Sequence, residues 1–328
     1  MRVVSALLCQ GEKNIDFIEV GSILKSEEML DMRSRKYSTA RIIITLLLFI
    51  VLTITLVFNG LAGPGSPPFS HSTGNVSDVY FTCITPAGYT FIIWGIIYFC
   101  LVLIALYAVA LLVLKVEGDP VYELGGAVSI QFMCTLIINF LFNIGWLFAW
   151  DDFNPTASFI LLLFVAITNV LALVIAAYGF SDRAEILFEK SKRLFWANIL
   201  VINGLAIYVV WTIIATLLNF TIFLSYGENL VLNNVCVGVL SFLLVACIVW
   251  FIVENTLLIR GANPLLAQYL VLVWSITGVY VEQLNEETAS NEVLALEVTI
   301  LSVGVLMTIF RILILTYRNR DNGIYSRI

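Results

Sequence analysis

Amide and aromatic side chains recur at helical spacing inside long apolar segments of this chain. Asn139, Asn143 and Trp146 stand at positions i, i+4 and i+7, so a helix there carries all three on one face. Carboxamides donate and accept hydrogen bonds, and indole rings stack on flat apolar molecules. The chemistry available to such a face is non-covalent recognition.

Two further apolar segments carry similar stripes of aromatic residues. One segment carries Phe91, Trp94 and Tyr98, with Tyr89 nearby. The other carries Tyr208, Trp211, Ala215 and Asn219 at positions i, i+3, i+7 and i+11. Hydrocarbon cannot satisfy amides, so we expect these faces to turn toward a shared interior. There they would line an amphipathic pocket or serve as plain interhelical contacts, and the spacing alone allows both.

No residue pattern in the chain predicts catalysis. The sequence contains no nucleophile–base pair, metal-binding cluster or phosphate-binding glycine loop, and its one histidine, His71, falls in a predicted loop. Most of the six cysteines lie in apolar runs and Cys83 stands alone in a loop, so we expect no disulfide framework. We therefore predict a protein that is not an enzyme and carries no metal or cofactor.

Composition indicates a polytopic membrane protein. The 328 residues are 60% hydrophobic and 12% charged, whereas soluble domains are about 25% charged. Apolar runs long enough to cross a bilayer recur along the chain and predict an all-α transmembrane bundle of about eight spans. The predicted spans are 42–62, 87–114, 127–150, 157–180, 195–222, 233–257, 264–281 and 294–316.

The distribution of charge predicts the orientation of this bundle. All 17 Lys and Arg residues fall in the N-terminal segment, the loops after even-numbered spans, or the C-terminal end. The opposite loops carry acidic residues only, which by the positive-inside rule places both termini in the cytoplasm. The net charge of −6 argues against nucleic acid as a partner.

Ionisable residues are nearly absent from the predicted spans. Glu254 lies in the last turns of the sixth span, near Arg260, and Glu297 lies in the first turn of the eighth. We expect both carboxylates to reach a membrane interface, so the sequence lacks the charged groups of an ion-coupled transporter.

Residues 1–41 are predicted to form a polar cytoplasmic segment without a cleaved signal peptide. The first outer loop contains Asn75-Val76-Ser77, an acceptor motif for N-glycosylation. A glycan at Asn75 would favour the plasma membrane or an endomembrane over a mitochondrial membrane.

The order of the three stripes resembles the translocator protein family, which includes the tryptophan-rich sensory proteins and peripheral benzodiazepine receptors. The second family helix carries a proline, a tryptophan and a tyrosine at the spacing of Pro86, Trp94 and Tyr98. The sequence TPAGYTFIIWGIIY most resembles the longer, divergent branch of the family. The stripes at 139–146 and 208–219 match the third and fifth family helices, with Asn139 where the family usually has glutamine. Ile207 replaces an expected proline, and the first outer loop is longer than the family's.

The resemblance implies a five-helix core at residues 42–222, followed by three additional helices at 223–317 and a cytoplasmic tail at 318–328. It implies binding of a porphyrin, a sterol or another small hydrophobic molecule, with transport, sensing and homo-oligomerisation left open. The ligand-binding residues would be Tyr89, Trp94, Tyr98, Asn139, Asn143, Trp146, Tyr208, Trp211 and Asn219. The alternative is a structural or assembly subunit of a membrane complex that binds no small ligand.

Overall fold

The computed structural model describes residues 17–286 and 290–322. The chain divides into two units, residues 1–44 and 45–328. The described part of the first unit is the beginning of helix α2 (Phe17–Ala62), and the rest of α2 belongs to the second unit. All the sites discussed below lie in the second unit.

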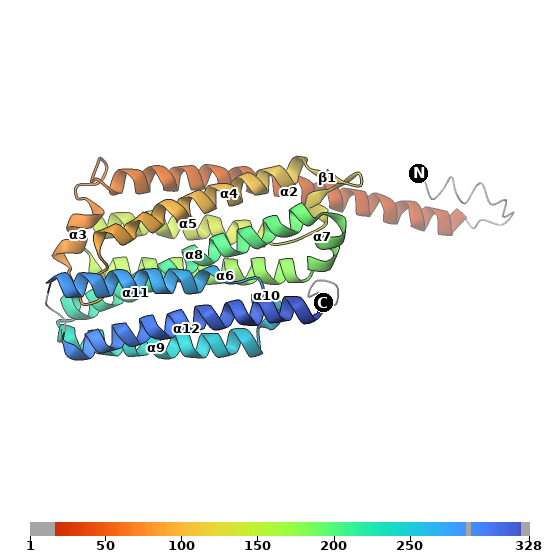
Figure 1. The fold of residues 1–328 in the computed structure, drawn as a ribbon. Helices are drawn as coiled ribbons and strands as arrows, with labels where there is room; N and C mark the ends of the chain where they lie inside the picture. Colours follow the sequence, from red (N-terminus) through yellow and green to blue (C-terminus); the bar gives the residue numbers. More distant parts are fainter. Residues whose placement is uncertain (1–16, 287–289, 323–328) are drawn as a thin grey trace. The chain divides into compact units, whose positions relative to one another are not determined.

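The second unit is a bundle of long helices (Figure 1). After α2 come α4 (Ile93–Val113), α5 (Ile130–Asp151), α6 (Pro155–Ser181), α8 (Lys192–Ile222), α9 (Leu232–Thr256), α11 (Ala267–Glu286) and α12 (Asn291–Asn322). The shorter helical elements are α3 (Thr73–Val79), η1 (Gly88–Ile92), η2 (Val121–Glu123), α7 (Ala184–Lys190), η3 (Phe223–Gly227) and α10 (Ile259–Ala262). Strands β1 (Lys115–Val116) and β2 (Asp119–Pro120) form a small antiparallel hairpin.

Within the described residues, seven helices are long and apolar enough to cross a membrane, and these match seven of the predicted spans. The other predicted span corresponds to α11, whose 20 residues give a length of about 30 Å but include the polar Gln268, Glu282 and Gln283. Figure 1 shows α11 running opposite to both α9 and α12. Helix α11 thus returns the chain between two helices of the same direction, as the eighth predicted span requires, and its crossing of the membrane stays a prediction.

Side-chain caps begin several of these helices where the apolar runs start. Ser129 accepts a hydrogen bond from the backbone of Phe132 at the start of α5, and Ser191 caps α8 through Leu194. Asn154 caps α6, where Pro155 occupies a position that needs no backbone donor. These caps satisfy amide groups that hydrocarbon could not.

Helix α8 lies at the centre of the packing. It packs against α4 and α6 and also against α11, while α12 packs against α9 and α11. In the most apolar stretch of α8, 56% of the residues are buried inside the bundle, whereas the corresponding share is 22–39% in the other six candidate spans. Different faces of α8 therefore pack against different groups of helices inside the bundle.

The sequence predicts no disulfide framework, but the structure contains a disulfide within the described residues. Cys83, in the loop before η1, and Cys236, in the first turns of α9, form a disulfide with their Cα atoms 6.2 Å apart. The two residues are 153 positions apart in the sequence, and Cys236 lies in an apolar run, so spacing gave no sign of the pairing. Cys100, Cys134 and Cys247 are free thiols.

The prediction that Glu254 and Glu297 reach an interface is also wrong. Both side chains are fully buried, because they lie where α9, α11 and α12 meet. Glu254 forms an ion pair with Arg311 of α12, with 3.0 Å between Oε1 and Nη2, whereas Arg260 pairs with Asp182 at the surface. The bundle thus contains a buried ion pair that the sequence did not lead us to expect.

Candidate functional site

Asn139 connects three helices through its carboxamide. Its Nδ2 donates to the carbonyl oxygen of Val165, at 2.8 Å, and to Oγ1 of Thr168, at 2.9 Å, both in α6. Its Oδ1 accepts a hydrogen bond of 3.0 Å from the hydroxyl of Tyr208 in α8. Both donors of this fully buried amide are used within the bundle, so Asn139 and Tyr208 hold α5, α6 and α8 together.

Asn59 of α2 forms a second polar connection, and the sequence reasoning missed it. Its Nδ2 donates to Oδ1 of Asn143 at 2.8 Å, and its Oδ1 accepts from the hydroxyl of Tyr98 at 2.7 Å. This amide therefore joins α2, α4 and α5. The available signal was an asparagine in the last turn of an apolar span, but no aromatic stripe accompanies it.

Aromatic rings fill the interface of α4 with α8. The ring of Trp94 stacks on Tyr98 with centroids 5.5 Å apart and planes inclined by 23°. The same indole meets Trp211 and Tyr208 of α8 edge-on, at 6.1 Å and 6.3 Å. Phe91 contacts the ring of Trp211 at 5.9 Å. We call the residues Asn59, Trp94, Tyr98, Asn139, Asn143, Tyr208 and Trp211 the aromatic–amide cluster.

Trp146 and Asn219 form a separate pair between α5 and α8. The indole Nε1 of Trp146 is 3.4 Å from Oδ1 of Asn219, whose Nδ2 donates to the backbone of Ala215. Trp146 also stacks on Trp150, with ring centroids 5.8 Å apart. The two residues thus face each other as the stripes predict, with their polar atoms directed at one another.

Tyr89 does not join the aromatic–amide cluster. Its side chain is 51% exposed and contacts Trp274 of α11, with ring centroids 5.8 Å apart. Tyr89 belongs to the 3₁₀ helix η1, whose three residues per turn break the 3.6-residue period assumed for this face.

Two buried donors in the aromatic–amide cluster lack a partner. Within the described residues, Nδ2 of Asn143 and Nε1 of Trp211 form no hydrogen bond, although the two residues are only 1% and 3% exposed. An unsatisfied buried donor costs about 1–3 kcal/mol. A bound molecule with acceptor oxygens would remove that penalty.

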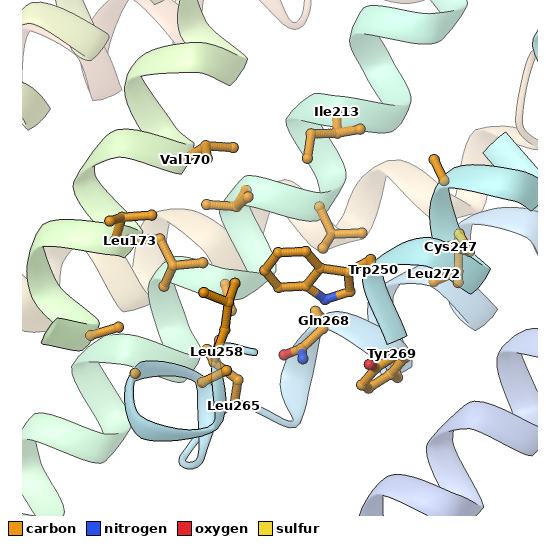
Figure 2. Close-up of a pocket in the computed structure, with 18 of the residues that line it drawn as sticks. Val170, Leu173, Ile213, Cys247, Trp250, Leu258, Leu265, Gln268, Tyr269 and Leu272 are labelled. Carbon is orange, nitrogen blue, oxygen red and sulfur yellow. The ribbon is translucent and has the colours of Figure 1, made fainter. Parts of the chain in front are cut away.

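A cavity of about 410 Å³ lies against a different face of α8 (Figure 2). Its walls come from α6, α8, α9, α10 and α11, and none of the nine residues predicted to bind a ligand lines it. The lining is almost entirely apolar and includes Trp250, Gln268 and Tyr269. Sequence patterns could not reveal this cavity, because its lining residues are mostly aliphatic and come from five elements.

Asn75 lies exposed in the short helix α3, while Ser77 of the same motif is buried. Attachment of a glycan to Asn75 remains a prediction.

Comparison with known proteins gives one match. A family model described as TSPO-like protein matches residues 43–317. No curated protein and no solved structure gives a significant match. The family match extends from α2 into α12, well beyond the five helices for which the sequence motifs gave a resemblance.

Proposed function

Because the chain belongs to the TSPO-like protein family, we propose that this multi-pass membrane protein binds a small hydrophobic or planar molecule at the aromatic–amide cluster. A porphyrin or a sterol fits the chemistry of such a site. Indole and phenol rings offer flat apolar walls, and amides offer a small number of orienting hydrogen bonds. The binding chemistry is non-covalent, and we assign no catalytic function.

The observation that carries this proposal is the presence of two unpartnered donors within the aromatic–amide cluster. Nδ2 of Asn143 and Nε1 of Trp211 are buried without acceptors in the described part of the chain. Trp94 and Phe91 both contact the indole of Trp211. A carboxylate or hydroxyl oxygen of a ligand would accept from the free donors while its apolar body lies against the rings.

The test is porphyrin binding to purified variants, followed by the absorbance of the porphyrin itself. Trp94→Ala and Trp211→Ala should each weaken binding about tenfold, because each removes an aromatic wall. Trp196→Ala is the matched control, since that indole lies on α8 but is 55% exposed. Unchanged affinity in both cluster variants, with normal helical content and elution, would place the site elsewhere.

A structural or assembly role is the second candidate, and a specific observation favours it. Both donors of Asn139 bond to α6, and Asn59 forms hydrogen bonds with Tyr98 and Asn143. Helix packing without a ligand accounts for these contacts. Crosslinking of the protein purified in mild detergent separates the two functions. A stoichiometric partner, together with thermal stability that porphyrins and sterols leave unchanged, would favour the assembly role.

We also propose the plasma membrane or an endomembrane as the location. The disulfide between Cys83 and Cys236 lies at the end of the bundle where the loops carry only acidic residues. Disulfides persist in oxidising compartments, which suits an outer face directed to the exterior or a lumen. Asn75 lies in the same outer region.

A further inference from the structure

Helix α12 carries two ionisable residues in the stripe that it buries against α9 and α11. The buried positions of this stripe are Val293, Glu297, Ile300, Gly304, Met307 and Arg311. Arg311, near the end predicted to face the cytoplasm, is paired with Glu254. Glu297, near the opposite end, is equally buried, yet both of its carboxylate oxygens lack a hydrogen-bond partner within residues 17–286 and 290–322.

The other buried glutamate shows what this bundle provides for an ionised carboxylate. Glu254 pairs with Arg311 at 3.0 Å. It also accepts hydrogen bonds from Nε2 of Gln268, at 2.8 Å, and from the hydroxyl of Tyr269. These partners offset the loss of water around the charge. Glu297 has no such partner, and an isolated ionised carboxylate in an apolar interior is far more costly than a neutral acid.

The helices packed around Glu297 supply no cation. The sequence between Arg260 and Arg311 contains no Lys, Arg or His, and Arg311 lies about 21 Å from Glu297 along α12. The outer halves of α9, α11 and α12 and the segment joining the last two carry Tyr280, Glu282, Glu286, Glu287 and Glu292, besides the disulfide-bonded Cys236. Four of these groups are acids, and negative charges nearby oppose a further negative charge.

We infer that Glu297 binds a proton exchanged at the outer end of the bundle, so that pH controls how firmly α12 packs on α9 and α11. With the proton bound, the neutral side chain fits between Val293 and Ile300, which belong to a buried apolar cluster. Loss of the proton leaves a buried charge without a partner, and movement of the outer end of α12 lets water reach it. Glu297 lies about two turns from the start of α12, so a small movement is sufficient.

Helix α12 is the least constrained of the three helices at this end. Helix α9 is tied to the loop before η1 by the disulfide of Cys236 with Cys83. Helix α11 is tied to the same loop, because Nε2 of Gln283 donates to the carbonyl oxygen of Thr82 at 3.3 Å. In the described part of the chain, the outer half of α12 forms no hydrogen bond or ion pair with another helix. Deprotonation therefore displaces α12 and leaves α9 and α11 in place.

The first test is infrared spectroscopy of the unchanged protein in liposomes, with its glutamates labelled by carbon-13 in the side-chain carboxyl group. A protonated carboxyl group has a C=O band separate from the bands of ionised carboxylates, and the label shifts this band. We expect a protonated glutamate band at neutral pH that weakens as the medium is made alkaline. Absence of such a band at neutral pH would overturn the inference without any variant.

Variants then assign the band to its residue. Glu297→Gln has nearly the shape of the protonated acid and cannot ionise, so the fold should be kept while the band disappears. Glu292→Gln is the matched control, because this glutamate lies on the same helix but is exposed, and the band should remain. Retention of the whole band in Glu297→Gln would contradict the assignment.

Thermal stability measures the link between the proton and helix packing. The melting temperature of the parent should fall by several degrees as the medium is brought from neutral to alkaline pH, because a buried charge appears. Glu297→Gln should lose most of this pH dependence, because its side chain stays neutral. An equal fall in the parent and in Glu297→Gln would contradict control of packing by this residue. Porphyrin is absent from these measurements, so their outcome is separate from that of the proposed function.

Discussion

Two buried or partly buried indole N–H groups, one on α5 and one on α8, differ in their hydrogen bonding. Nε1 of Trp211 is buried without a partner among the described residues, whereas Nε1 of Trp146 donates to Asn219. Unsatisfied buried donors destabilise a fold, and satisfied ones stabilise it modestly. The same side chain therefore supports the proposed binding function at one position and contributes to helix packing at the other.

This contrast gives a prediction for two conservative substitutions. Trp211→Phe removes an unpaired donor while keeping an aromatic ring, so thermal stability without ligand should stay the same or rise, while porphyrin affinity falls. Trp146→Phe removes a hydrogen bond and should lower stability by about 1 kcal/mol. Thermal unfolding in detergent, with and without porphyrin, measures both effects. A clear loss of stability in Trp211→Phe would mean that its N–H group has a structural partner.

At the scale of helices, α11 approaches η1 through a glycine. The backbone N–H of Ala87 donates to the carbonyl oxygen of Gly278 at 3.1 Å, and Nε1 of Trp274 donates to the carbonyl oxygen of Thr90. A Cβ atom at position 278 would lie 2.0 Å from Cγ2 of Thr90. Only a residue without a side chain allows this contact between α11 and η1.

Gly278→Ala should therefore destabilise the protein by about 1–3 kcal/mol, because one of the two helices must move. Combining it with Thr90→Ser, which removes Cγ2, should restore much of the loss. Gly238→Ala is the control, since a Cβ there meets no atom within 4 Å and should leave stability unchanged or raise it. The melting temperatures of the three variants test this, and equal effects of the two single alanine substitutions would contradict the close approach.

At the scale of the whole second unit, the disulfide joins the outer loop before η1 to α9. Cys83 and Cys236 belong to a buried apolar cluster that also contains Leu240 and Ile276, so the bridge reinforces an existing core. It connects the segment that resembles the five-helix proteins to the additional helices. The family match across both parts agrees with one continuous bundle.

Cys83→Ser should lower the free energy of unfolding by about 2–5 kcal/mol, the range found when native disulfides are removed. Cys100→Ser, at a half-buried free thiol, should have a smaller effect. Mass spectrometry of a non-reduced digest should show the peptides of Cys83 and Cys236 linked. Detection of both residues as free thiols in protein from the native membrane would disprove the bridge and remove the main support for an oxidising outer compartment.

The sequence by itself determined most of the long helices and predicted their orientation in the membrane. Long apolar runs admit only helices in hydrocarbon, and the concentration of basic residues away from acid-only loops predicts the orientation, although Arg311 is buried in the bundle. It also indicated that amides at 139, 143 and 219 would turn inward, because lipid cannot satisfy them. These are properties of single segments and their solvent, so a linear pattern contains them.

Only the tertiary structure decided which inward faces meet. Asn59 pairs with Asn143 across 84 positions, Cys83 with Cys236 across 153, and Glu254 with Arg311 across 57, and no local period specifies such partners. The cavity beside α8 depends on the packing of five elements, and the buried carboxylate of Glu254 in α9 depends on Arg311 of α12. Contacts between distant segments arise from how helix faces fit together, which is why these partners became visible only in three dimensions.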